Sequence, residues 1–93
     1  MKTYHLNRTN REYNFKIEAT CIEDNGRFIL KKGSIISPYE LNGLSKRMKK
    51  IRETAPIGED HLLKEDMVFD SLYDAACFVI GTNASDKWFQ PID

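Results

Sequence analysis

Residues 66–88, DMVFDSLYDAACFVIGTNASDKW, carry the pattern that decides the fold. Ser71 is a favourable N-cap, and Asp74 three residues later completes a Ser-x-x-Asp capping box. The following residues 75–80, AACFVI, are apolar on every side, which predicts a buried helix rather than a half-exposed one. Gly81 can adopt the left-handed conformation that ends helices. The sequence therefore predicts a short central helix with a signal at each end.

The segments on either side of this helix suggest how it is held. Met67–Phe69 precede it as a short strand, and the polar loop Thr82–Lys87 follows it. Trp88, the only tryptophan, and Phe89 come next. These two side chains are an apolar anchor that closes the core, although a base-stacking platform remains an alternative.

A β-hairpin is predicted upstream. Apolar and polar residues alternate from Tyr13 to Ala19, the period of a half-buried strand, and Thr20–Ile22 continue it. Asn25-Gly26 supplies residues that tolerate positive φ, and Arg27–Lys31 form the return strand.

A second helix is predicted after the hairpin. Ser37-Pro38 suits a helix start, since proline is tolerated in the first turn, and Pro56 and Gly58 end the segment. One helical stripe is formed by Leu41, Leu44, Met48 and Ile51.

Cationic residues cover the remaining surface of this predicted helix. Lys46, Lys49 and Lys50 lie opposite the stripe, and Arg47 and Arg52 flank them. This face is the candidate nucleic-acid contact, because it carries enough positive charge to meet several phosphates. The alternative is a solvated helix face balanced by acidic residues elsewhere.

The remaining segments complete a single domain. Residues 1–12 are expected to form an extended N-terminal arm or an edge strand, and residues 59–64 a strand or an extended linker. Residues 13–93 form one α+β domain, a small and mostly antiparallel sheet carrying two helices.

Two segments resemble a known family. Residues 26–34, GRFILKKGS, are similar to the "G-F-V-V-L-K-G-S" hairpin return of a domain of unknown function found at the C-terminus of GIY-YIG nucleases and in restriction-modification proteins. Residues 66–81 resemble its second motif, "D-Y-x-F-S-S-P-S-A-A-A-x-x-V-L-G". The shared positions of that motif are Asp66, Phe69, Ser71, Ala75, Ala76, Val79, Ile80 (for Leu) and Gly81. The resemblance covers roughly residues 13–90.

The chain also departs from that family. Its Ser-Pro-Ser is replaced by Ser71-Leu72-Tyr73, and Asp86 stands where the family has a glycine before its tryptophan. A weaker similarity links the same helix to domains associated with DNA methylation enzymes. Both resemblances imply a DNA-processing setting, with a nuclease or methylase as partner, and neither carries a catalytic residue into this chain.

The charge distribution, the two cysteines and the start of the chain bear on the partner and the cellular location. Of the charged residues, twelve basic and six acidic ones lie in residues 1–58, and two basic and eight acidic ones in residues 59–93. Such asymmetry marks either one cationic face or two halves that attract each other. Cys21 and Cys77 are expected to be buried, unpaired thiols. The start of the chain has no signal-peptide pattern and no segment resembles a membrane span, so we expect a cytoplasmic protein without membrane contact.

Motifs for catalysis or metal binding are weak. Ser71 is expected to cap a helix, because a nucleophilic serine needs a histidine base and nothing places His5 or His61 beside it. His61 next to Glu59 and Asp60 does not make a metal site. We therefore expect no enzyme activity and no cofactor.

Two functions remain open from the sequence. The first is a module that contacts DNA or RNA without sequence specificity through Lys46, Arg47, Lys49, Lys50 and Arg52. The second is a protein-interaction module that docks a nuclease, a methylase or another copy of itself near Tyr73 and Trp88. The sequence does not decide the oligomeric state.

Overall fold

A five-stranded antiparallel sheet with the order β4-β3-β2-β1-β5 forms the base of the protein. The computed structural model describes residues 1–10, 14–41 and 43–92. The elements, in chain order, are β1 (Lys2–Asn10), β2 (Phe15–Asp24), β3 (Arg27–Leu30), α1 (Lys46–Thr54), β4 (Met67–Phe69), α2 (Leu72–Ile80), the 3₁₀ turn η1 (Asp86–Trp88) and β5 (Gln90–Pro91). The α+β class with two helices is confirmed.

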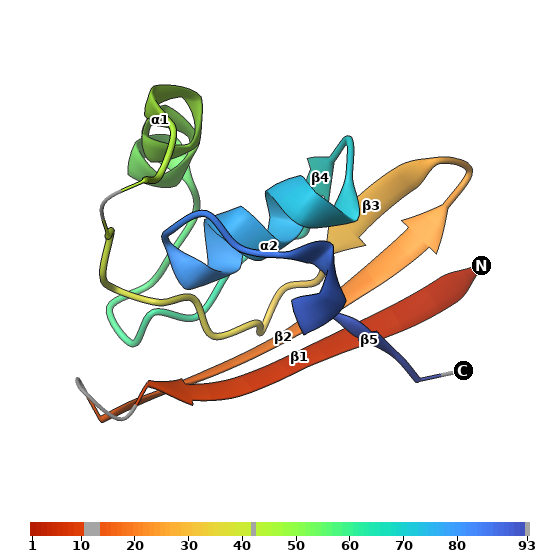
Figure 1. Ribbon diagram of the computed structural model, residues 1–93, viewed down its shortest axis with the longest axis horizontal. Helices are drawn as coiled ribbons and strands as arrows, with labels where there is room; N and C mark the ends of the chain where they lie inside the picture. Colours follow the sequence, from red (N-terminus) through yellow and green to blue (C-terminus); the bar gives the residue numbers. More distant parts are fainter. Residues whose placement is uncertain (11–13, 42, 93) are drawn as a thin grey trace.

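Helix α2 lies on one face of the sheet, and α1 packs on α2 (Figure 1). Side chains alternate across β2, so Ile17, Ala19 and Cys21 face α2 and are buried. Six consecutive residues of α2, Ala75 to Ile80, are buried as well. The core is therefore the layer between α2 and the sheet, as the apolar run in the sequence predicts.

Both ends of α2 follow the sequence prediction. The Ser71 hydroxyl accepts a hydrogen bond from the Asp74 amide at 3.0 Å, which satisfies one free N–H of the first turn. Gly81 ends the helix with φ of +84°, and its amide donates to the Cys77 carbonyl.

The predicted hairpin is present as β2 and β3. Asn25 and Gly26 both have positive φ, 52° and 77°, as a two-residue turn of the type that matches strand twist requires. Cys21 pairs with Leu30 and Ile22 with Ile29, which brings the apolar side chains of the two strands into line. The predicted first residue of this hairpin, Tyr13, lies outside the described residues.

The predicted start of the second helix at Ser37-Pro38 is wrong, because α1 begins at Lys46 with Ser45 as its N-cap. The preceding residues instead bond to the end of α2: the amide of Ser37 donates to the Val79 carbonyl, and that of Leu41 to the Gly81 carbonyl. These bonds hold the segment against the end of α2, and Leu41 is 38% exposed rather than part of a helical stripe.

The end of α1 agrees with the predicted stop. The helix closes at Thr54, and Ala55 has extended backbone geometry. A residue before proline disfavours helical geometry, and Ala55 precedes Pro56. Met48 is buried and Ile51 is partly buried against the core, so these two stripe residues anchor the helix.

The N-terminal residues form a strand rather than an arm. β1 pairs with β2 from Lys2 to Asn10, and β5 covers its outer edge only at Tyr4 and His5. The predicted segment continues to residue 12, and its last two residues lie outside the described part. Segment 59–64 contributes single bridges, Leu62 to Ile35 and Leu63 to Ile57. No helix among the described residues is long and apolar enough to cross a membrane.

Candidate nucleic-acid interface

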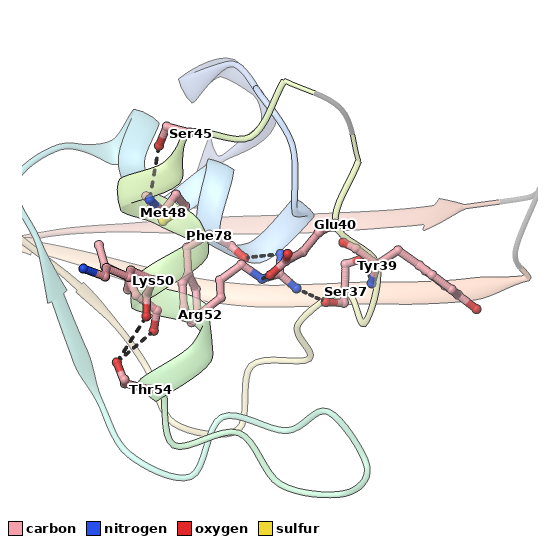
Figure 2. Close-up of polar contacts among 10 residues, drawn as sticks. Ser37, Tyr39, Glu40, Ser45, Met48, Lys50, Arg52, Thr54 and Phe78 are labelled. Atoms are coloured by element: carbon pink, nitrogen blue, oxygen red, sulfur yellow. Dashed lines mark hydrogen bonds and ion pairs between the residues drawn. The ribbon is translucent and has the colours of Figure 1, made fainter.

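The candidate interface is the outer face of α1. Ser45 caps the helix by accepting a hydrogen bond from the Met48 amide at 3.1 Å (Figure 2). Met48 turns inward, so the residues on the opposite side of the helix are left in solvent. Lys46, Lys49 and Lys50 are exposed there, and helical geometry places them within ~100° of one another.

These lysines share one surface hollow, which we call the basic face. Its lining residues are Lys46, Arg47, Lys49, Lys50 and Glu53. Within the described part of the chain, none of the three lysines forms an ion pair. Glu53 stands one turn further along the helix and offsets part of the charge at that end.

Arg47 belongs to the basic face but is partly neutralised. Its guanidinium lies 3.0 Å from the carboxylate of Asp74 in the first turn of α2. The arginine side chain is 61% exposed and the aspartate 19%, so the guanidinium can still be reached from solvent. This pair joins the basic and the acidic halves of the chain, as does the ion pair of Lys31 with Asp66 at 2.9 Å.

The assignment of Arg52 to the basic face is wrong. Its side chain is only 6% exposed, and its guanidinium donates to the backbone carbonyls of Phe78, at 3.1 Å, and of Ser37. Figure 2 shows the side chain turned from α1 toward the end of α2 and the 37–40 segment. The Glu40 carboxylate lies 3.6 Å from Nε. Burial lowers the pKa of Arg52, and the nearby Glu40 charge opposes that shift.

The first turn of α1 contains no acidic residue. Helix N-termini carry a partial positive charge from their free amides, and carboxylates normally balance it. Here Lys46 and Arg47 stand at that position instead. Although Asp74 partly neutralises Arg47, Lys46 adds its charge to that of the free amides, so a phosphate at the start of the helix would meet both the helix dipole and a lysine.

The second predicted surface, Tyr73 and Trp88, comes from two different elements. Tyr73 is 43% exposed in the first turn of α2. Trp88, in η1, is partly buried against the core, and the Arg8 guanidinium lies 3.7 Å from the centre of its ring. The sequence did not indicate Arg8, because eighty positions separate it from the tryptophan.

Residues considered for catalysis have structural partners. Ser71 caps α2, His5 lies 3.4 Å from Glu18, and His61 packs edge-on against the Phe15 ring at 5.5 Å. Among the described residues, no group of three or more His, Cys, Asp and Glu side chains could hold a metal ion.

Both cysteines are buried and unpaired, as the sequence predicts. Burial raises the pKa of the Cys21 thiol to about 11, with a smaller effect from the nearby Glu23 charge. The Cys77 sulfur accepts a hydrogen bond from the Ala84 amide at 3.4 Å, which fixes the loop after α2. A thiol held protonated in a core is a poor nucleophile.

No family model, curated protein or solved structure matches this chain.

Proposed function

We propose that this protein is a non-catalytic accessory module that contacts nucleic acid, without sequence specificity, through the basic face of α1. The observation that carries the proposal is the cluster of Lys46, Lys49 and Lys50, exposed on one helix side without an ion pair in the described part of the chain. The family resemblance supports a DNA-processing setting related to nucleases and restriction systems.

The chemistry of this face suits phosphates rather than bases. Lysine ammonium groups on flexible stems are strong phosphate ligands but poor readers of base edges, which favour planar arginine or amide groups. Arg47 has the required planar group, but Asp74 already occupies part of it. We therefore expect binding that depends on charge and is indifferent to sequence.

The salt dependence of binding tests this proposal quantitatively. Three lysines neutralise about three phosphates, so the logarithm of affinity should fall against the logarithm of salt concentration with a slope of about −3 on duplex DNA. Fluorescence anisotropy with labelled duplex DNA, single-stranded DNA and RNA of several sequences measures this slope.

A double charge-reversal variant tests whether the basic face of α1 is the surface that binds nucleic acid. The variant Lys46→Glu/Lys50→Glu should reduce the slope and weaken binding equally on every sequence. The control Lys16→Glu/Lys64→Glu makes the same change in net charge on exposed residues outside α1 and should bind nearly as the parent does. Melting temperatures should hardly move for either, because exposed charges contribute little to stability. Equal losses in both variants, or no salt-sensitive binding by the parent at low ionic strength, would refute the proposal.

A second candidate function is docking of a protein partner, a nuclease, a methylase or another copy, through the first turn of α2. The exposed Tyr73 ring favours it, since tyrosine is enriched at interfaces. Association of this kind should tolerate salt and change the oligomeric mass. Light scattering at two salt concentrations, on the parent and Tyr73→Ser, distinguishes it from nucleic-acid binding.

A further inference from the structure

The outer edge of β1 is only partly covered. β5 pairs with β1 at Tyr4 and His5, and the Ile92 amide donates to the Thr3 carbonyl. Beyond His5, no described strand pairs with this edge, although β1 runs on to Asn10. Figure 1 shows β5 as a short segment beside the first part of β1, with the rest of that strand at the border of the sheet.

The direction of the backbone groups follows from the bond to Thr3. In an antiparallel strand the backbone N–H and C=O groups of every second residue point to the same neighbouring strand. The backbone groups of the residues in phase with Thr3 therefore point away from β2. Asn7 and Thr9 are in phase with it, and both are exposed. Among the described residues no partner bonds to their outward N–H and C=O groups, which can therefore pair with an added strand.

A hollow of about 380 Å³ lies beside this edge. Its lining residues are Leu6, Asn7, Arg8, Lys87, Trp88 and Gln90. No carboxylate is among these described lining residues, and neither Arg8 nor Lys87 forms an ion pair within the described part of the chain. The Arg8 guanidinium carbon lies over the Trp88 ring at 3.7 Å from its centre, a cation–π contact that uses none of the N–H donors for a hydrogen bond to the ring plane and leaves them able to bind an anion.

We propose that this edge binds an acidic, extended peptide segment of another protein. The segment adds as a strand to β1 beyond β5, pairs with the backbone of Asn7 and Thr9, and directs a carboxylate side chain to Arg8 and Lys87. Backbone pairing supplies the affinity and the hollow supplies the preference for acidic side chains.

Charge decides between this partner and a second copy of the chain. Two β1 edges paired with each other would bring Arg8 and Lys87 of both copies into one region, and like charges in that position repel. An acidic segment meets the same two cations favourably. This surface is separate from the basic face of α1, so the inference does not depend on nucleic-acid binding.

The probe for the test is a fluorescent octapeptide in which glutamate alternates with valine. Its first control is the same peptide with every backbone amide methylated, which keeps the charge but leaves no N–H on either edge to pair with β1. The second control replaces each glutamate with lysine. Because α1 also attracts anions, binding is measured on the Lys46→Glu/Lys50→Glu variant as well as on the parent.

We expect the unmethylated acidic peptide to bind both proteins alike and the two control peptides to bind at least about tenfold more weakly. Arg8→Gln and Lys87→Gln should each weaken binding several-fold, whereas Lys2→Gln, at the opposite end of β1, should not. Amide hydrogen exchange should slow at Asn7 and Thr9 and stay unchanged at Arg8, whose amide already faces β2.

Three results would overturn the inference. One is equal binding of the methylated and unmethylated acidic peptides, which would show attraction by charge alone. Another is the absence of binding at millimolar peptide. The third is protection of the Asn7 and Thr9 amides by single-stranded DNA but not by the peptide, which would assign the edge and its hollow to nucleic acid.

Discussion

Arg52 offers the sharpest test of how the two helices are held together. Its guanidinium joins three segments: α1, on which it stands, the last turn of α2 through the Phe78 carbonyl, and the 37–40 segment through the Ser37 carbonyl. The Phe78 carbonyl belongs to the last four residues of α2, which have no partner within the helix. Arg52 therefore caps α2 from a neighbouring helix.

The perturbation is Arg52→Met, which keeps the length and apolar packing of the side chain but removes every donor. Two hydrogen bonds from a charged donor are lost, each worth about 1.5–3 kcal/mol, and two carbonyls lose their partner. The Met variant no longer has to bury a charge, which offsets part of that loss. The Glu40 contact adds little, because that carboxylate is 40% exposed. We expect a net loss of about 3–5 kcal/mol.

Urea unfolding followed by circular dichroism measures this loss, with an unchanged m-value as the sign that both proteins unfold in the same two-state manner. A domain of this size has about 5–14 kcal/mol of stability in total, so the midpoint should move by a large fraction. Arg52→Lys should lose less, since an ammonium keeps the charge but lacks the planar fork that reaches both carbonyls.

The matched control is Lys50→Met, two positions earlier on the exposed face of the same helix. It should change stability by about 0.5 kcal/mol or less. If Arg52→Met and Lys50→Met unfold at the same urea concentration, the guanidinium does not hold the two helices together, and Arg52 returns to the candidate phosphate ligands.

Three further predictions concern the core and its boundaries. Ser71→Ala should cost about 0.5–2 kcal/mol in thermal or urea unfolding, because the Asp74 amide loses its partner, and the folded variant should still bind nucleic acid. A variant that stays stable but no longer binds would make Ser71 a contact residue. Gly81→Ala should cost about 1–3 kcal/mol in urea unfolding, because its φ is +84° and an added Cβ would meet the Tyr39 carbonyl and the Arg52 guanidinium. An unchanged free energy of unfolding would contradict that close approach. The raised pKa of Cys21 means that the folded state holds its proton more tightly, so this group's contribution to stability is complete below about pH 9 and is lost as pH rises toward 11. Iodoacetamide should therefore leave the folded protein unlabelled at pH 8 and label it in urea. Rapid labelling without urea would show an accessible thiolate.

Local signals in the sequence were sufficient for the central elements. The Ser71 cap, the six apolar residues after Asp74 and Gly81 define α2, because helix ends depend on groups within one turn. Asn25-Gly26 defines the hairpin in the same way, since positive φ at two successive residues is a property of those residues themselves. Lys46, Lys49 and Lys50 were also placed correctly on the exposed side of a helix, because the buried Met48 fixes the phase.

Tertiary contacts decided the features that the sequence could not supply. α1 starts late because the amides of Ser37 and Leu41 bond to the end of α2, a partner some forty residues away. Arg52 leaves the basic face because carbonyls of Phe78 and Ser37 lie within its reach, and no spacing rule encodes them. The stacking of Arg8 on Trp88 and the partly open edge of β1 likewise arise only when the two ends of the chain meet in one sheet. Side-chain periodicity reports which way a residue points along its own element, whereas the groups it meets there belong to other elements and are set by packing.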